Sequence, residues 1–273
     1  YLPSGEYDKN PNDEEENDII LYARYEHIDI IISYDANGGQ NAPANQSMKF
    51  GGSITLSDQR PTRDGFEFDG WGLTADAKIA SYYTSSKYED YSEVTRTLYA
   101  IWKDKYYVIK YTDTNANNMP ENGSKKHGDT YLITDVIPTK NGYDFVDWVD
   151  KDNNHYKSGD AYNTNADLEL FTNFAEKTFT IKYNANANNE SVSVPADGIK
   201  YYTKDYNIDN SVIPTRTGYD FLGWNTIPNP ANNLILFTSN GVIGNDYNTN
   251  LTLYAIWKEK TYTIKFNANG GSD

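Results

Sequence analysis

Strictly alternating apolar and polar residues mark several short stretches of the chain. In the stretch 261–266, Tyr262, Ile264 and Phe266 alternate with threonine and lysine. Period-two alternation of aromatic and β-branched residues predicts a strand with one buried face. The same pattern occurs three more times, at Ile30, Ile32 and Tyr34, at Tyr107, Ile109 and Tyr111, and at Phe179, Ile181 and Tyr183. Four similar strands are therefore expected.

Each alternating stretch ends in a turn rich in asparagine and glycine. Residues 35–39 read Asp-Ala-Asn-Gly-Gly, and residues 267–271 read Asn-Ala-Asn-Gly-Gly. The Asn-Gly step readily adopts positive φ and marks a reversal of the chain. The two middle copies, 115–118 and 186–189, carry asparagine in place of glycine. Asparagine tolerates positive φ better than most residues, so we expect the turn to persist there.

A second strand follows in a polar stretch, and a Pro-Thr step then precedes a third strand. The proline, at position 61, 138 or 214, fixes φ, and the glycine four residues later supplies a positive-φ corner. In the last copy, Tyr219 and Phe221 lie on one face of the predicted strand and Leu222 and Trp224 on the other. Apolar residues on both faces indicate a strand covered on both sides, or a helix packed across it.

Helical periodicity is weak along the whole chain. The segment 85–94 is the best helix candidate, in an otherwise strand-like pattern. The pattern therefore predicts a mainly β, or α+β, fold.

Two sequence signatures recur at long range. The first, Gly-aromatic-acidic-Phe ending in Trp, occupies 65–71, 142–148 and 218–224, so that its tryptophans lie 77 and 76 residues apart. The second, Leu-Tyr-Ala-Ile-Trp, stands at 98–102 and 253–257, with degraded copies at 21–25 and 170–174. Repetition at a fixed period indicates a tandem array of small domains. Enzymes keep one copy of a site, so the repeats favour a structural or binding protein.

The signatures also give the expected domain boundaries. These are 1–27 (the closing part of a preceding repeat), 28–103 (repeat 1), 104–177 (repeat 2), 178–260 (repeat 3) and 261–273 (the opening strand of a following repeat). About three charged residues separate successive repeats, unlike a flexible Gly/Ser tether. We therefore expect repeats placed end to end in a semi-rigid rod, with three domains of this size spanning roughly 90–110 Å.

Aromatic residues supply the expected core. A domain of this size buries only about 60% of its unfolded surface, and the chain has no cysteine to form a disulfide or a cysteine-type zinc site. The chain instead contains 25 tyrosines and five tryptophans, all of the latter within the two signatures. Each buried aromatic side chain removes ~150–250 Å² from water. The tryptophans are therefore interpreted as core residues rather than ligand-stacking residues.

The chain has a formal net charge of −15 and contains no stripe of basic residues. Both features argue against nucleic acid or an anionic lipid surface as partner. No apolar run is long enough to cross a bilayer, and no signal peptide or C-terminal sorting signal is recognisable.

Three motifs, in fixed order, resemble the Listeria–Bacteroides repeat family, which includes the B repeat of internalin B. They are the stretches 262–271, 214–224 and 253–258. The resemblance covers essentially the whole chain and implies a β-grasp-like fold, tandem display on bacterial surface proteins, and a role in spacing or adhesion. It implies no catalytic residue. Repeat 2 departs most from the pattern, since Asp147 replaces a glycine and Asn173-Phe174 replaces Ile-Trp.

Candidate chemistry is sparse. The histidines, at 27, 127 and 155, occupy unrelated positions, form no ligand spacing and are expected at the solvated surface. The run 150–154 begins like a calcium loop, but His155 and Ala161 stand where that loop needs glycine and glutamate, so a plain polar turn is favoured. The acidic run 13–16, with Asp18, is interpreted as a solvated loop.

Two further groups of residues were weighed. A Lys–Asn isopeptide bond would need a lysine in a dry core, whereas the aligned lysines Lys110, Lys182 and Lys265 alternate onto the outward face of their strands. Tyrosines in the variable segments could bind a partner or pack at the edge of the core, and we favour packing. They are Tyr82, Tyr83, Tyr88, Tyr91, Tyr201 and Tyr202.

The sequence thus predicts a non-enzymatic repeat region of a bacterial cell-surface protein, extracellular or cell-wall associated, that acts as a semi-rigid stalk. No catalytic, cofactor-binding or metal-binding residue is assigned, no cofactor is expected, and the nearest partners are further repeats of the same polypeptide. The alternative is an adhesin whose repeats bind a protein or glycan on another cell, or self-associate into a filament through exposed strand edges.

Overall fold

A computed structural model of the 273-residue chain describes residues 22, 24, 26, 28–89, 94–267 and 269–271. The described residues form strands joined by turns and irregular loops, with one short 3-10 helix, η1 (Ala231–Asn233). The chain divides into two compact units, with the boundary between Lys105 and Tyr106. The expected mainly β fold is confirmed. Most of residues 1–27, including His27 and the acidic run, lie outside the described residues.

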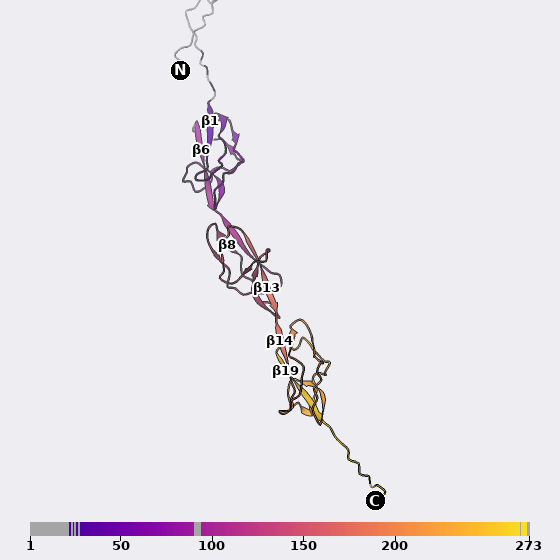
Figure 1. The fold of residues 1–273 in the computed structure, drawn as a ribbon. Coiled ribbons are helices and arrows are strands. Elements are labelled where there is room, and N and C mark those ends of the chain that lie inside the picture. Colours follow the sequence, from indigo (N-terminus) through magenta and orange to yellow (C-terminus); the bar gives the residue numbers. More distant parts are fainter. Residues whose placement is uncertain are drawn as a thin grey trace, which may run out of the picture. The chain divides into compact units, whose positions relative to one another are not determined.

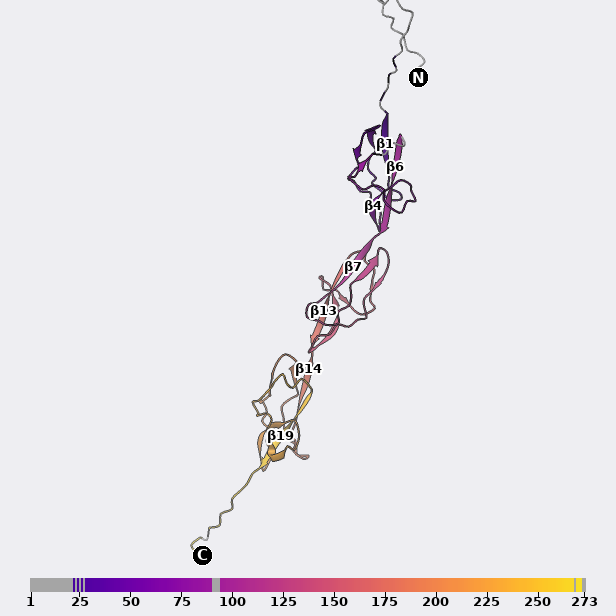
Figure 2. The same ribbon diagram turned by 180° about the vertical axis from the view of Figure 1, so that it is seen from behind.

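Repeat 1 forms a four-stranded sheet in which the first and last strands lie at the centre. The strand order is β2-β1-β6-β4, with β1 and β6 parallel and both outer pairs antiparallel. Figures 1 and 2 show β1 and β6 side by side. A separate two-stranded sheet pairs β3 with β5. The bounds are β1 (Asp29–Asp35), β2 (Gln46–Lys49), β3 (Ile54–Thr55), β4 (Phe66–Gly72), β5 (Lys87–Tyr88) and β6 (Thr95–Asp104).

Repeat 2 has the same central arrangement with one additional edge strand. Its sheet order is β11-β10-β13-β7-β8, with β7 and β13 parallel, and β9 pairs with β12 in a second small sheet. The bounds are β7 (Tyr106–Thr112), β8 (Gly123–Lys126), β9 (Tyr131–Leu132), β10 (Tyr143–Val149), β11 (His155–Tyr156), β12 (Ala161–Tyr162) and β13 (Leu168–Glu176).

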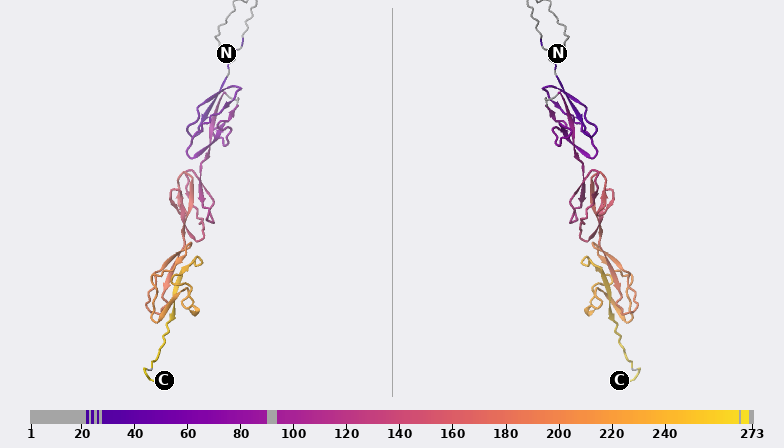
Figure 3. Two further views of the ribbon diagram at one scale, coloured as in Figure 1. Left: turned by 90° about the vertical axis from the view of Figure 1, so that its right-hand side faces the viewer. Right: turned by 90° about the vertical axis from the view of Figure 1, so that its left-hand side faces the viewer.

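Repeat 3 returns to the four-stranded form. Its order is β15-β14-β19-β17, with β14 and β19 parallel, and β16 pairs with β18. The opening strand expected at residues 261–266 does not form, because the described chain beyond β19 has no neighbouring strand with which to pair (Figure 3). The bounds are β14 (Thr178–Asn184), β15 (Gly198–Tyr201), β16 (Tyr206–Asn207), β17 (Tyr219–Asn225), β18 (Val242–Ile243) and β19 (Leu251–Glu259).

Each sheet buries the alternating apolar residues that its sequence predicts. In repeat 1, Ile30, Ile32 and Leu98 have no exposed surface, and Trp71 packs against Tyr34 with ring centroids 4.8 Å apart. Corresponding clusters form around Trp148 and Trp224. The tryptophans of the first signature are fully buried, and those of the second are buried or half-buried, which confirms that they are core residues.

In repeats 1 and 3, the turn after the opening strand holds that strand to the closing strand. In repeat 1, Asn37 and Gly38 have φ of 48° and 85°, and Asn186 has φ of 49° in repeat 3. The Asn37 side-chain Nδ2 donates to the Ala100 carbonyl at 3.0 Å, and Asn186 Nδ2 donates to the Ala255 carbonyl at the same distance. Asparagine thus serves both the backbone conformation and the link between strands.

The third strand of each repeat differs from its expected form. Apolar residues on both faces predicted cover on both sides, but a β-bulge between Phe221 and Gly223 shifts the pairing with β19. The extra residue, Leu222, brings Trp224 to the face of Phe221, and the two rings pack edge-to-face at 5.1 Å. The same bulge occurs in β4 and β10. The two-sided apolar pattern therefore reflects a bulge.

The helix proposed for residues 85–94 is wrong where the structure describes that segment. Lys87 and Tyr88 form β5 and pair with Thr55 and Ile54. Tyr88 is buried in the core of repeat 1. In so short a stretch, the pattern of apolar and polar residues fits the period of a helix as well as that of a strand. Pairing with β3 makes this stretch a strand.

The bulge predicts a strong and local effect of the Gly223→Ala substitution. Gly223 has φ of +148°, and an added Cβ would lie 2.7 Å from the Phe237 carbonyl oxygen. Backbone strain alone costs ~1–3 kcal/mol, and the contact adds to it. We expect faster exchange of core amide protons of repeat 3, such as those of Ile181 and Leu253. The matched control is Gly218→Ala, where φ is +77° but nothing lies within 4 Å of the added carbon. Equal effects of the two substitutions would contradict this account.

Candidate functional site

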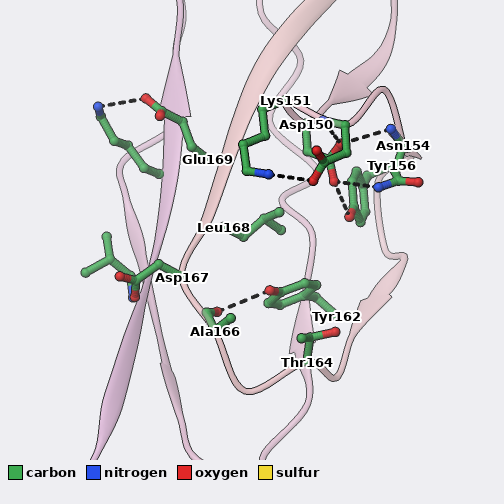
Figure 4. Close-up of a pocket in the computed structure, with 13 residues that line it drawn as sticks. Asp150, Lys151, Asn154, Tyr156, Tyr162, Thr164, Ala166, Asp167, Leu168 and Glu169 are labelled. Atoms are coloured by element: carbon green, nitrogen blue, oxygen red, sulfur yellow. Dashed lines mark hydrogen bonds and ion pairs between the residues drawn. The ribbon is translucent and has the colours of Figure 1, made fainter.

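The clearest concave surface is a groove of about 630 Å³ in repeat 2. Its apolar part comes from Val108, Ala166 and Leu168, and Tyr156 and Tyr162 form part of its wall (Figure 4). Charged side chains surround these residues. They are Lys110, Asp150, Lys151, Asp152, Asp167 and Glu169. Four carboxylates against two ammonium groups disfavour an anionic ligand and suit a neutral hydroxylated or cationic one.

The polar groups of the groove are largely engaged with one another. Tyr162 donates its hydroxyl hydrogen to the Ala166 carbonyl at 3.2 Å, and Tyr156 donates to Asp150 Oδ2 at 3.0 Å. Burial, followed by this hydrogen bond, raises the pKa of Tyr156 to about 12. Lys110 Nζ contacts Glu169 Oε1 at 2.8 Å. The Lys110 hydrogen bond holds the pKa of Glu169 below its ordinary value. A ligand would therefore have to bind beside these hydrogen bonds and this ion pair, or displace them.

The run 150–154, which begins like a calcium loop, is a turn closed on one carboxylate. Asp150 accepts hydrogen bonds from the Asp152 and Asn154 backbone amides at 2.9 Å each, and from the Asn154 side chain. Burial alone would raise the pKa of Asp150, but these bonds and the Tyr156 hydroxyl lower it to about 2. Asn153 completes the turn at φ of 62°. The Asp150 oxygens are therefore used within the turn.

The departures of repeat 2 from its signature form one network. Asp147 is buried and pairs across the sheet with Asn173, whose Nδ2 donates to Asp147 Oδ1 at 2.8 Å. His155 Nδ1 lies 3.0 Å from Asp147 Oδ2. The other repeats place Gly and Ile at the two paired positions, Gly70 with Ile101 and Gly223 with Ile256. The two replacements are therefore adjacent and satisfy each other.

The Asp147–His155 pair does not form a nucleophilic site with the described residues. The His155 ring contacts Asp147, and no serine or threonine hydroxyl within the described ranges is hydrogen-bonded to that ring. Such chemistry needs a nucleophile within hydrogen-bond reach of the base. Among the described residues, no group of three His, Cys, Asp or Glu side chains could hold a metal ion.

His155 is exposed, as predicted, but both described histidines make specific side-chain contacts. His155 contacts the buried Asp147, and His127 is half-buried, with Nδ1 3.0 Å from the Tyr107 hydroxyl and Nε2 3.2 Å from Asn165 Nδ2. No sequence pattern signals these contacts, because their partners lie on other strands and loops.

Two lysines that sequence reasoning missed are buried in the second strands. Lys125 and Lys200 are 2% and 1% exposed, and their Nζ atoms lie 3.0 Å from Asn165 Oδ1 and Asn248 Oδ1, respectively. Each also donates to the carbonyl of the next residue. Met48 occupies this buried position in repeat 1. Aligning the second strands would have shown lysine at an apolar position. The lysines weighed from the sequence lie elsewhere, and Lys110 is exposed.

Repeats 2 and 3 meet in a specific joint. Between β13 and β14 only Lys177 intervenes. Tyr202, at the end of β15, packs directly against Gly142, and Asn141 Nδ2 donates to the Tyr202 hydroxyl oxygen at 2.8 Å. Thr203 donates its amide and its hydroxyl to Glu176 Oε1 at 2.7 and 2.6 Å. These are contacts between two repeats rather than within one.

The tyrosines of the variable segments divide between packing and exposure. Tyr88 is buried, Tyr82 packs against the core of repeat 1, and Tyr202 is in the joint. Tyr83 and Tyr201 are exposed. Tyr91 lies outside the described residues. Packing at the edge of the core is thus confirmed for some of these residues.

The fold and these contacts define a tandem all-β repeat protein whose shared features are packing features. A family model described as the Listeria–Bacteroides repeat domain matches residues 31–101, 107–172 and 179–256. The chain therefore belongs to the Listeria–Bacteroides repeat family, and the resemblance seen in its motifs is confirmed. This family is typical of bacterial surface proteins, and with the fold it points to a non-catalytic structural domain.

Two relatives from Evansella cellulosilytica extend this comparison. One, whose name describes it as a Gly-rich membrane protein, is 24% identical over 261 residues, covering 94% of this chain and 28% of the relative. Another, also named as a membrane protein, is 27% identical over 214 residues, covering 76% of this chain and 30% of the relative. The chain spans less than a third of either relative. Within the described residues, no helix is long and apolar enough to cross a membrane.

The buried lysines predict a paired mutational effect. Asn248→Ala removes the side-chain acceptor of Lys200 and leaves a buried ammonium group with the Tyr201 carbonyl alone. We expect a loss of ~1–3 kcal/mol in the unfolding free energy of repeat 3. The double variant Lys200→Met/Asn248→Ala places at position 200 the methionine that residue 48 provides in repeat 1, and it should recover most of that loss, because an apolar side chain needs no acceptor. Amide hydrogen exchange of repeat 3 measures both. A double variant no more stable than Asn248→Ala would refute the pairing.

The Asp150 turn predicts a dependence on pH. Because folding lowers the pKa of Asp150 from about 3.8 to about 2, its stabilising effect is present above 3.8 and is lost as the pH falls through 2. The ¹³C resonance of its carboxyl group should therefore titrate with a midpoint near 2. Tyr156→Phe removes one donor and should raise that midpoint. A midpoint near 3.8 in the unaltered chain would show that the turn is open in solution.

Proposed function

We propose that this chain is a semi-rigid spacer of a bacterial cell-surface protein, built from repeats 28–103, 104–177 and 178–260 placed in series. The observation that carries this proposal is the joint between repeats 2 and 3. A single residue between strands, an aromatic ring against Gly142 and two hydrogen bonds to Glu176 restrict motion between neighbours. A Gly/Ser tether would have none of these restraints.

The topology of each repeat supports this proposal. The opening and closing strands are parallel neighbours, so the chain enters a repeat at one end of its sheet and leaves at the other. Successive repeats joined in this way gain length with each copy. The central parallel pair flanked by antiparallel strands also supports the grasp-like assignment. The family and the relatives named as membrane proteins support an extracellular or cell-wall location.

The alternative function is adhesion, and the groove of repeat 2 is the observation that favours it. Tyrosine walls beside carboxylates and amides suit a hydroxylated ligand such as a glycan. The groove depends on the run 150–154, which repeats 1 and 3 lack. A single groove would give none of the avidity that many equivalent sites provide. We therefore favour the spacer, with further repeats of the same polypeptide as its nearest partners.

Small-angle scattering on the chain and on a variant lacking residues 178–260 tests the spacer. The deletion joins Lys177 to Thr261, which has the same place in the opening strand as Thr178. We expect the maximum dimension to fall by one module, roughly 30 Å from the size of a domain of this length. Dimensions that do not change with the deletion, or that grow with protein concentration, would reject a monomeric spacer. The deletion keeps repeat 2, so glycan-array binding through the groove would persist and identify the adhesin.

A further inference from the structure

The end of repeat 3 has the same backbone geometry as the end of repeat 2, where repeat 3 is bound. Gly142 and Gly218 have φ of +81° and +77°. Each accepts a hydrogen bond at 2.9 Å from the lysine that follows the closing strand, Lys177 or Lys260. Glu259 holds the sequence position of Glu176. The elements of the joint are therefore already formed at this end.

The two ends differ in that a ring from the following repeat packs against the glycine of repeat 2, whereas no described residue packs against the glycine of repeat 3. An added Cβ on Gly142 would lie 2.1 Å from the Tyr202 ring, whereas nothing lies within 4 Å of one on Gly218. Gly142 is buried, and Thr217 and Glu259 are exposed. The Glu259 carboxylate accepts one bond at 3.2 Å, from the Tyr219 hydroxyl, and keeps acceptor capacity for others.

The segment that follows this end carries an apolar face without a sheet to cover it. Tyr262, Ile264 and Phe266 are 79%, 77% and 94% exposed. Their counterparts in repeat 3 are Phe179, Ile181 and Tyr183, of which Ile181 and Tyr183 are buried in the core and Phe179 is partly buried. Figure 1 shows this segment extending away from the end of β19 with no other element beside it. Three large exposed apolar side chains on one face mark a surface that another element can cover, and the same alternation opens each of the three repeats.

We propose that Thr217, Gly218, Glu259 and Lys260 form a docking site for the end of the second strand of another repeat, the one that opens at Thr261. The occupant presents a planar ring against Gly218 and a neighbouring N–H or O–H donor to Glu259. This inference rests on the proposed spacer and specifies how its repeats are held.

The repeats of this chain define the chemistry of the occupant. The positions equivalent to Tyr202 are Phe50 and His127, so all three repeats carry a ring there. A ring can pack flat against a glycine, whereas a Cβ at that glycine would collide with it. The donor follows the ring directly, as Thr203 follows Tyr202. A docking partner without a ring at this position would leave Gly218 uncovered.

The test uses residues 1–260 followed by a second copy of 178–260, so that the added repeat brings its own Tyr202 to Gly218. Because the chain has no cysteine, paired cysteines can be spin-labelled selectively. One pair, Asp135→Cys with Asp197→Cys, spans the occupied joint. The other, Asn210→Cys with the added copy of Asp197→Cys, spans the new joint, since Asn210 holds the position of Asp135. We expect distance distributions with the same mean and the same narrow width.

Two substitutions at the new joint provide the controls. Glu259→Ala, combined with Tyr202→Ala in the added copy only, should broaden the second distribution and leave the first unchanged. Both residues are outside the buried core, and unchanged amide exchange at Leu253 would show that repeat 3 remains folded. A broad distribution in the unsubstituted extended chain would overturn the docking site. So would a distribution that narrows only at high protein concentration, since the occupant would then be a second copy of the chain.

The two proposals fail separately. An extended chain that gains one module in length, but with a broad label distribution at the new joint, retains the spacer and rejects the docking site. A narrow distribution in a particle that gains no length retains the docking site and rejects the spacer.

Discussion

Parallel hydrogen bonding between the first and last strands is the constraint on which each repeat depends. In repeat 1 it joins Ile31–Asp35 to Thr95–Tyr99, more than 60 residues further along the chain. Parallel neighbours cannot be joined by a tight turn, so the intervening residues form a long crossover connection that includes the outer strands β2 and β4. That crossover supplies Leu56, Trp71 and Tyr88 to the core. The same pairing leaves the two ends of the repeat at opposite ends of the sheet.

In this arrangement the closing strand both lies inside the sheet of its own repeat and leads into the next repeat. It pairs with the opening strand on one side and with the bulged third strand on the other, as β19 does with β14 and β17. It also continues directly into the next opening strand, with one residue between β13 and β14. Displacement of one repeat relative to the next would therefore act on the central strand of both sheets. This continuity explains why the charged joints are short and why specific contacts form around them.

The sequence predicted what depends on local pattern. Alternation located the opening strands of the three repeats but also predicted one at residues 261–266, where none forms. Asn-Gly steps located the turns, and repetition identified the tryptophans as core residues. The bulge at Leu222 was not predictable, because the two-residue period places Phe221 and Trp224 on opposite faces unless an extra residue is inserted. The groove was missed for a related reason. Its residues come from β7, β11, β12, β13 and the loops before β11 and after β12, which only the tertiary fold brings together.

The polar differences between repeats occur in contacting pairs. Lysine replaces Met48 in the second strands of repeats 2 and 3, and each lysine meets an asparagine oxygen. Asp147 replaces a glycine, and Asn173 replaces the isoleucine that would face it. A buried polar group costs more than it contributes unless its partner is present, so a replacement of one member alone would destabilise the sheet. When both residues of a contacting pair are replaced together, repeats with different side chains can keep the same sheet topology. The glycine at that joint permits the least variation, because positive φ and the space for a ring both exclude a side chain there.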